Sequence, residues 1–169
     1  MTKFHKNVRL PTYDYSTPGY YFVTIVVAHR RACLGNIDGE TMILSPMGEI
    51  VKQGWLWLAK QYPFVRLDEY VIMPNHLHGI LQIVECGSGC GGVNESAARL
   101  SMGRLVAAFK TVTTREINRF ESASGRKFWQ DDFYEHVVRN DHDLRAIQEY
   151  VRNNPLQWML DQENPDRID

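Results

Sequence analysis

The sequence predicts an α+β fold in which helices pack against an antiparallel sheet. Short runs of β-branched and aromatic residues, typical of strands, alternate with longer runs of helical spacing. Their order is strand, helix, strand, strand, helix, strand, and a further helix follows, which is the order of a ferredoxin-like sandwich. With 169 residues, 44% of them hydrophobic, the chain can bury one core, so we expect residues 1–169 to form a single domain.

The first half of the chain is expected to supply a strand, a hairpin and a helix. Residues 20–29 are β-branched and aromatic and follow turn residues, which indicates a buried strand. Residues 34–44 hold turn-forming residues between apolar ones, the pattern of a hairpin or an extended excursion. The Ser-Pro pair at 45–46 supplies a cap and a first helical residue, so the sequence predicts a helix over 46–61.

The second half supplies the remaining strands and helices. Two short runs at 67–73 and 77–84, joined through a Pro-Asn pair, are expected to be antiparallel neighbours. The glycine-rich segment 85–94 is typical of a loop. Beyond it, the pattern predicts a helix over 97–118, a strand over 133–138 and a helix over 141–153 that is capped by Asn140.

The composition of the chain limits the classes of protein to which it could belong and the cellular compartment in which it would be found. Lys and Arg number 19 against 20 Asp and Glu, and the formal charge of −1 gives no global electrostatic case for nucleic acid. No apolar run reaches the roughly 18 residues that span a bilayer, and no cleavable leader is visible, so we expect a soluble cytoplasmic protein without a membrane partner. Three cysteines fit a reducing compartment; Cys86 and Cys90 could be half of a zinc site, but no second pair exists.

Two histidines separated by one residue are candidate metal ligands. On a strand, His76 and His78 point to one face and Leu77 to the other. Two imidazoles one strand repeat apart can hold a single divalent cation. The same short pattern also occurs where histidines are merely structural.

The C-terminal helix offers a second pair of candidates. Tyr150 and Asn154 are spaced i to i+4 and so share one edge of its buried stripe. A phenol has an unperturbed pKa of about 10 and needs a nearby cation or acceptor to act as a nucleophile at neutral pH. A metal held by His76, His78 and the Asn154 amide oxygen could polarise a phosphate beside this phenol. The two residues equally fit a core-edge tyrosine and a helix end before Pro155.

Three motifs together resemble the REP-associated tyrosine transposases, which are relatives of the insertion-sequence-200-type transposases in the HUH single-tyrosine superfamily. The motifs are MPNHLH at 73–78, FYEHVVRN at 133–140 and EYVRNNP at 149–155. The similarity runs from near Tyr20 to about Trp158. The joint order and spacing of the three motifs is far more specific than any one of them.

This resemblance implies a metal-dependent enzyme that cuts and rejoins single-stranded DNA at hairpin-associated sites. His76 and His78 would be paired metal ligands, Asn154 the third ligand, and Mg²⁺ or Mn²⁺ the cation, although the ligands alone would also suit zinc or nickel. Tyr150 would attack a phosphodiester and leave a 5′-phosphotyrosine on the enzyme and a 3′-hydroxyl on the DNA, which can later reseal the strand. Such chemistry needs no nucleotide-binding loop, and the sequence has neither a Walker nor a Rossmann motif.

The resemblance also implies contacts with single-stranded or hairpin DNA. Phosphate contacts are then expected from six cations that alone would describe an ordinary solvated surface: Lys110, Arg115, Arg119, Arg126, Lys127 and Arg139. His136 is expected to contact the catalytic residues without contacting the DNA or the metal itself. Phe128 and Trp129 could stack on unpaired bases or pack into the core. A protein that binds DNA in this way would be found in the cytoplasm, associated with the nucleoid.

Other interpretations share the same fold. A domesticated protein could nick or bind repeat hairpins without mobilising DNA, a regulator could bind DNA without cutting it, and a hydrolase could use a bound water. Only the hydrolase would keep its activity after Tyr150→Phe. The insertion-sequence relatives act as dimers whereas the REP-associated ones resemble monomers, so both a monomer and a homodimer stay open.

Overall fold

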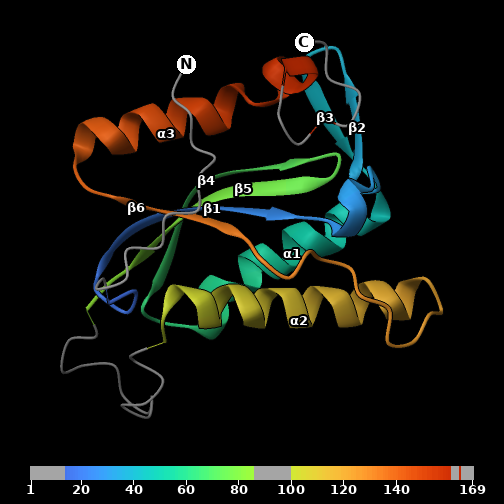
Figure 1. The fold of residues 1–169 in the computed structure, drawn as a ribbon, viewed down its shortest axis with the longest axis horizontal. Helices are drawn as coiled ribbons and strands as arrows, with labels where there is room; N and C mark the ends of the chain where they lie inside the picture. The colour runs from blue at the N-terminus through green and yellow to red at the C-terminus, as the bar shows by residue number, and fades with distance from the viewer. Residues whose placement is uncertain (1–13, 86–99, 161–163, 165–169) are drawn as a thin grey trace.

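A computed structural model of the chain describes residues 14–85, 100–160 and 164 (Figure 1). Within these residues, four strands form one antiparallel sheet in the order β4-β5-β1-β6. Their bounds are Gly19–Val26 for β1, Val65–Met73 for β4, His76–Ile83 for β5 and Tyr134–Val138 for β6. The helical crossovers of a ferredoxin-like sandwich produce this order, so the predicted fold class is confirmed.

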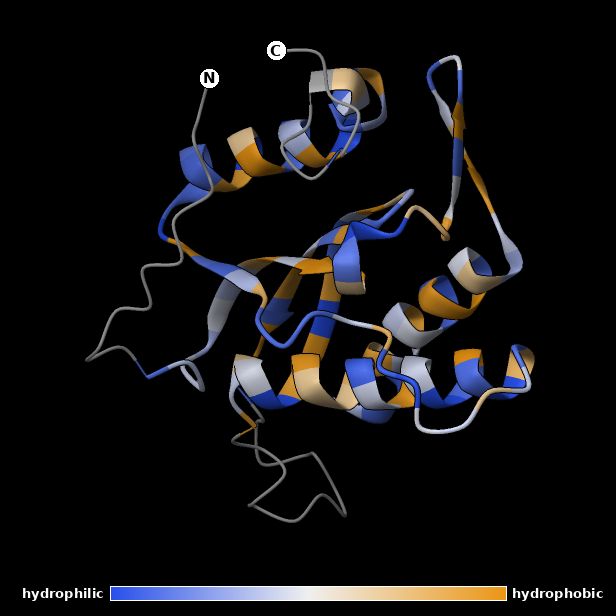
Figure 2. Cartoon of the chain, turned by 45° about the vertical axis from the view of Figure 1, so that its right-hand side comes forward, coloured by the Kyte–Doolittle hydropathy of each residue, from blue (hydrophilic) through white to orange (hydrophobic). Residues whose placement is uncertain are grey.

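Three helices of the described chain cover the two faces of this sheet. Helices α1 (Pro46–Gln61) and α2 (Met102–Phe120) lie on one face, and α3 (Asp141–Asn153) lies on the other (Figure 1). Each helix carries hydrophobic and hydrophilic stripes (Figure 2), as expected for helices with one side against a sheet. The sheet is therefore buried on both sides.

Strand alternation divides the apolar residues between two cores of different size. The larger core lies under α1 and α2, where Tyr21 and Val23 of β1 share a cluster with Trp55. The smaller core lies under α3, and its fully buried members are Phe22, Ile80, Ile147 and Val151. Helix α3 thus has a narrow apolar contact with the sheet and relies on further contacts for its position.

A second, two-stranded sheet stands beside the end of the chain. Strands β2 (Gly35–Asp38) and β3 (Thr41–Leu44) form the expected hairpin, and the 3₁₀ helix η3 (Pro155–Leu160) follows α3 and lies next to that hairpin (Figure 1). The β2–β3 hairpin and η3 together flank the end of α3.

Both expected helix caps are present. The Ser45 side chain accepts a hydrogen bond from the Gly48 N–H, and the Asn140 side chain accepts one from the Asp143 N–H. Such caps satisfy backbone donors that have no partner within the helix. They set the first turns of α1 and α3 as the sequence predicted.

Several predicted boundaries were wrong. The first strand ends at Val26 rather than at residue 29, because Ala28–Arg30 form a 3₁₀ turn in which His29 and Arg30 have positive φ angles of 59° and 52°. The Val27 N–H donates to the Asn75 carbonyl, which continues the pairing with β5 by one residue before this turn. The helix expected from residue 97 begins at Met102.

Other calls lie outside the described residues. These include residues 97–99, the glycine-rich segment beyond residue 85, and Cys86 with Cys90. Among the residues that are described, no helix is both long and apolar enough to cross a membrane.

Candidate active site

Two histidines of β5 face α3 from the side of the smaller core. The cross-strand register sets His76 opposite Val26 and His78 opposite Thr24 of β1. Both histidines are fully buried, and their ring centroids lie 4.4 Å apart. Leu77 between them lies in the larger core, because successive side chains on a strand alternate between faces.

The His78 ring has hydrogen-bond partners at both nitrogens. Thr24 Oγ1 lies 2.8 Å from Nδ1, and the Tyr150 hydroxyl lies 3.2 Å from Nε2. We assign the proton to Nδ1, because a neutral tyrosine can donate to Nε2 while the threonine hydroxyl accepts from Nδ1. Thr24 then favours the tautomer in which Nε2 carries the lone pair that a cation would use.

The partners of Asn75 assign the tautomer of His76 in the same way. Asn75 Nδ2 donates to the Arg30 carbonyl over 3.1 Å, which turns the amide Oδ1 toward His76 Nδ1, 2.8 Å away. An amide oxygen only accepts, so His76 Nδ1 is the donor and its Nε2 carries the lone pair. Both histidines therefore offer Nε2 as a ligand atom.

Tyr150 reaches His78 from α3 across the smaller core. Its ring centroid lies 5.2 Å from that of His78 and 6.1 Å from that of Phe22, which it meets edge to face. The Phe22 ring also stacks on His78 at 5.4 Å. Aromatic contacts of this kind restrict ring orientation, so Phe22 positions both the phenol and the imidazole.

Asn154 is a buried amide at the end of α3. Its residue is 1% exposed, and neither its Oδ1 nor its Nδ2 has a hydrogen-bond partner among the described residues. A buried amide without partners costs free energy unless a ligand satisfies it. Asn154 lies one helical turn after Tyr150 and four residues before Trp158, whose ring centroid lies 6.0 Å from that of His76.

The donor set fits a divalent cation. Two neutral imidazole nitrogens and one amide oxygen are available at buried positions, and the orphaned Asn154 amide is the observation that favours a missing ligand. No cluster of three His, Cys, Asp or Glu side chains occurs in the described part of the chain. A metal in that part would therefore have to be held by a mixed set such as His76, His78 and Asn154.

Polar contacts to β4 supplement the narrow apolar contact of α3. Gln148 Nε2 donates to the Asp68 carboxylate over 2.9 and 3.1 Å. The Arg152 guanidinium donates to Glu69 Oε1 through Nε at 2.9 Å and Nη2 at 2.8 Å. Gln148 and Arg152 flank Tyr150 on α3, and their partners lie at the irregularity of β4 between Leu67 and Tyr70. The two contacts thus set the position of Tyr150 along the sheet.

His136 lies at the other end of α3. It occupies β6 opposite Phe22, and its Nε2 lies 2.9 Å from Asp143 Oδ2 in the first turn of the helix. Asp143 precedes Tyr150 by seven residues, about 10 Å along the helix axis. The contact seen for His136 therefore fixes the start of α3 rather than the phenol itself.

Tyr134 is a second tyrosine on the same face of the sheet. It lies opposite Thr24, and its ring meets Phe22 at 6.1 Å. Burial, and secondarily the Asp143 carboxylate, raises the pKa of the Tyr134 phenol above its ordinary value. Tyr134 thus loses its phenol proton less readily than a solvated tyrosine does.

Most of the cations expected to contact DNA lie on the opposite face of the molecule from Tyr150. A cleft of about 740 Å³, here named the α2 cleft, lies between α2 and the segment 123–131. Four of the six expected cations line it: Lys110, Arg115, Arg119 and Lys127. Arg126 is exposed and pairs with Glu121 at 3.4 Å. Arg139 is exposed just after β6, and its backbone N–H donates to Asp143 in the first turn of α3.

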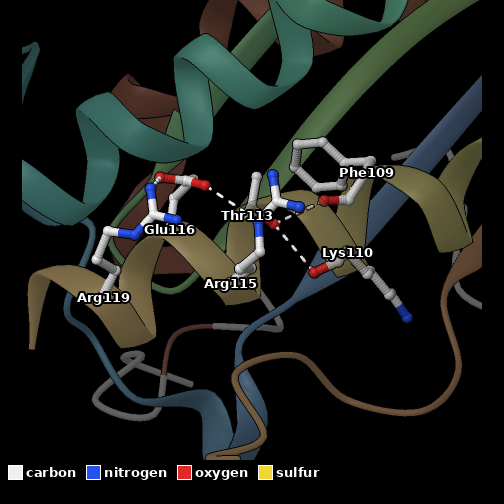
Figure 3. A network of polar contacts seen from close by, with 6 residues as sticks. All are labelled: Phe109, Lys110, Thr113, Arg115, Glu116 and Arg119. Carbon is white, nitrogen blue, oxygen red and sulfur yellow. Dashed lines mark hydrogen bonds and ion pairs between the residues drawn. The ribbon is translucent and has the colours of Figure 1, made fainter. Parts of the chain in front are cut away.

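The cations of the α2 cleft already have protein partners. Arg115 and Arg119 both contact Glu116, at 3.1 and 3.0 Å (Figure 3). Lys127 lies 2.6 Å from Asp131, which lowers the pKa of that carboxyl through hydrogen bonding and charge. These pairs are exposed and worth little, so a phosphate could compete for each cation.

Lys110 differs from the other cations because it holds a loop. Its Nζ donates to the carbonyls of Gln130, Asp131 and Asp132 at 2.8, 3.1 and 3.1 Å. Burial lowers the pKa of Lys110 to about 8, against the opposing effect of the nearby carboxylates of Asp132 and Asp131. All three donors of the ammonium are engaged, so a phosphate contact would require this loop to move.

Phe128 and Trp129 belong to the core. Each is 3% exposed, and Trp129 Nε1 donates to Thr113 Oγ1 at 2.9 Å. Of the two roles that the sequence left open, the structure therefore supports packing for both residues rather than base stacking.

The sequence did not single out Thr24, Phe22, Asn75 or the partners of α3 on β4. Thr24 and Phe22 lie within a run of apolar and β-branched residues that gives no sign of their partners. Their relation to His78 depends on the register between β1 and β5, which alternation alone does not supply. Asn75 is part of the first motif and directly precedes His76. This adjacency was the one sequence feature that could have indicated its contact with His76.

Comparison with known proteins gives a consistent set of relatives. No model of a known protein family matches the chain. An uncharacterized protein of Haemophilus influenzae is 34% identical over 166 residues, covering 93% of this chain and 91% of that protein. The REP-associated tyrosine transposase of Escherichia coli K12 is 25% identical over 144 residues, covering 84% of this chain and 69% of that protein.

One solved structure shares the fold. It is a REP-associated tyrosine transposase bound to a REP hairpin, and it superposes with a TM-score of 0.58 at 20% identity. The match covers 82% of this chain and 67% of the other. Identity and fold thus point to the same group of proteins.

Proposed function

Because the chain is similar in sequence to REP-associated tyrosine transposases and shares the fold of one of them, we propose that it is a metal-dependent enzyme that cuts and rejoins single-stranded DNA through Tyr150. The observation that carries the proposal is that Tyr150 of α3 lies against the two histidines of β5, with a buried, unsatisfied amide one helical turn further along. The Tyr150 hydroxyl lies 3.2 Å from His78 Nε2, His76 lies beside that ring, and the Asn154 amide is buried without a partner in the described structure.

Tyr150 is the nucleophile. Its oxygen attacks the phosphorus of one phosphodiester, the bond from phosphorus to the 3′ oxygen breaks, and the DNA leaves with a free 3′-hydroxyl. The enzyme keeps the 5′ phosphate as a phosphotyrosine. A 3′-hydroxyl that later attacks this phosphotyrosine restores the phosphodiester and frees the phenol, so the exchange needs no external energy source.

The surrounding residues orient the phenol. The hydrogen bond from the Tyr150 hydroxyl to His78 Nε2 sets the place of the phenol oxygen beside the two histidines. Phe22 restricts both rings, and the contacts of Gln148 and Arg152 with β4 hold α3 in register. Such positioning lowers the entropic part of the barrier.

A divalent cation, Mg²⁺ or Mn²⁺, would be held by His76, His78 and Asn154 and would polarise the scissile phosphate. The assigned tautomers support this ligand set, because Thr24 and Asn75 hold each histidine with its Nε2 unprotonated. At His78 the cation would replace the Tyr150 hydroxyl, which donates to that nitrogen in this structure. The Asn154 amide would supply an oxygen, the kind of ligand atom that Mg²⁺ and Mn²⁺ prefer.

The DNA partner is a hairpin with an adjoining single strand. The solved relative with this fold is bound to a REP hairpin. Of the expected phosphate contacts, Arg139 lies next to the start of α3, the helix that carries Tyr150, and the four cations of the α2 cleft with Arg126 offer a second positive surface. Long-range steering of the DNA by this second surface would weaken as salt is raised.

Metal-dependent covalent capture tests the proposal. Labelled hairpins with single-stranded flanks are incubated with Mg²⁺ or Mn²⁺ and the full chain, and products are separated on denaturing gels. Wild type is expected to form a protein–DNA adduct that is lost without metal, in Tyr150→Phe and in His76→Ala. Tyr134→Phe is the matched control, since it removes a phenol from the same face, and it should keep the adduct.

The other outcomes separate the competing interpretations. Cleavage that survives in Tyr150→Phe would mean that water, rather than the phenol, attacks the phosphate. Tight hairpin binding without cleavage under any metal condition would mean a DNA-binding protein on the same fold.

A further inference from the structure

A pocket lies directly beside the candidate active site. It measures about 480 Å³, within the usual range of small-molecule sites, and is named here the η3 pocket. The β2–β3 hairpin forms one wall and η3 the other, with Pro74 at the base. The residues used below are Asn36 and Ile37 from β2, and Leu156, Trp158 and Met159 from η3.

The η3 pocket is continuous with the cluster around His76. Pro74 comes two residues before His76, and Pro155 comes immediately after Asn154, so the pocket begins where the metal-ligand candidates end. Trp158 belongs to both places, because it lines the pocket while its ring lies 6.0 Å from the His76 ring. The η3 pocket therefore adjoins the candidate metal ligands.

The chemistry of the lining suits a nucleobase and not a phosphate. None of the described residues that line the η3 pocket carries a charge. The residues that line it include one indole and several aliphatic side chains. A base fits such a surface, since it has an aromatic face for stacking.

Two large apolar side chains that line the pocket are exposed to solvent. Leu156 is 53% exposed and Met159 is 50% exposed, although both are large apolar residues. Exposed apolar side chains that gather in a concave place are typical of binding sites. Asn164 is buried and donates to the Trp158 carbonyl at 3.0 Å, which holds this part of η3 in place.

We propose that the η3 pocket binds one unpaired nucleobase of the strand that is cut, next to the scissile phosphate. The inference rests on the proposed function for the identity of the strand. A base within a duplex is stacked and paired and would have to leave the stack to enter the pocket, so the pocket would favour cutting at single-stranded positions.

Abasic scanning tests the inference. Each nucleotide around the cleavage position is replaced in turn by an abasic analogue, and binding to Tyr150→Phe is measured by fluorescence anisotropy. One position is expected to weaken binding by roughly 5- to 150-fold, the range that corresponds to one lost base–aromatic stack. Adding Trp158→Ala should produce a similar loss on intact DNA and abolish the sensitivity to the abasic analogue at that position.

Two further variants separate the pocket from the metal cluster and from general loss of tryptophan. Ile37→Glu places a charge in the η3 pocket from the β2 side and should remove the same base sensitivity while leaving Mn²⁺ binding unchanged. Trp57→Ala changes a half-buried tryptophan of α1, on the other face of the sheet, and should leave the base sensitivity intact.

The outcomes also distinguish this inference from the proposed function. If wild type forms the adduct but no abasic position and neither pocket variant affects binding, the pocket inference is overturned and the nuclease stands. If no adduct ever forms but base-dependent binding is lost in Trp158→Ala, the pocket stands and the nuclease falls. If the pocket variants instead dissociate a dimer in sedimentation and leave DNA binding unchanged, the pocket binds a second copy of the chain and the inference is overturned.

Discussion

Replacing Thr24 by valine tests how the structure controls His78. Thr24 is 3% exposed and His78 is fully buried, so no water replaces the hydroxyl when it is removed. Valine keeps the shape but leaves the His78 Nδ1–H without the acceptor that now lies at 2.8 Å. An unsatisfied buried donor costs about 1–3 kcal/mol, and loss of a hydrogen bond behind a metal ligand lowers metal affinity about 10- to 100-fold.

Two measurements follow these two effects separately. Urea unfolding without metal is expected to show the loss of stability, and calorimetric titration with Mn²⁺ is expected to show the loss of affinity. Thr111→Val is the matched control, because the Thr111 hydroxyl is exposed on α2 and donates to the Ala107 carbonyl. Unchanged Mn²⁺ affinity in a destabilised Thr24→Val protein would refute the tautomer assignment, and unchanged stability would refute the hydrogen bond itself.

Three further predictions concern the scaffold. Gly79→Ala should destabilise the fold by about 1–3 kcal/mol in thermal unfolding, because the new methyl group would overlap the Trp55 indole; a variant as stable as wild type would contradict the packing. Glu69→Arg should lower adduct yield by displacing α3, and adding Arg152→Glu should restore it; absence of rescue would mean that the pair does not position the helix. From about pH 8 to 10.5, Lys110 is protonated in the unfolded chain but has released its proton in the folded one. The free energy of unfolding of wild type, measured relative to that of Lys110→Met, should therefore rise with pH over this range. A difference that stays flat or falls would contradict the lowered pKa.

The order of elements could be predicted from the sequence because each element has its own periodicity and caps. Ser45 and Asn140 marked the starts of α1 and α3, and a run of β-branched and aromatic residues marked β1. The end of β1 could not be predicted. It is set by the 3₁₀ turn Ala28–Arg30, whose Ala28 N–H donates to the Phe128 carbonyl, a contact between segments far apart in sequence.

The central residues of the candidate site were visible in the motifs, but their supports were not. His76, His78 and Tyr150 stand at spacings that suggest chemistry, whereas the role of Thr24 emerges only from the strand register. The sequence could not show that Lys110 holds a loop, since its three acceptors are backbone carbonyls with no side-chain signature.

The η3 pocket illustrates the same limit at the level of surfaces. Asn36 and Trp158 are more than a hundred positions apart, and no pattern in the sequence links them. They come together because β2 and β3 form a small sheet outside the main one and η3 follows directly on α3. Tertiary packing, rather than local propensity, therefore creates the η3 pocket.

Mapping the covalent bond by mass spectrometry tests the central claim most directly. The full chain is incubated with a cleavable hairpin and Mn²⁺, digested with trypsin and nuclease, and the peptide AIQEYVR at 146–152 is analysed by fragmentation. The account predicts a nucleotide joined to the Tyr150 oxygen through its 5′ phosphate, and none when metal is omitted. Cleaved DNA with an unmodified Tyr150 peptide, or with the nucleotide on another residue, would contradict it.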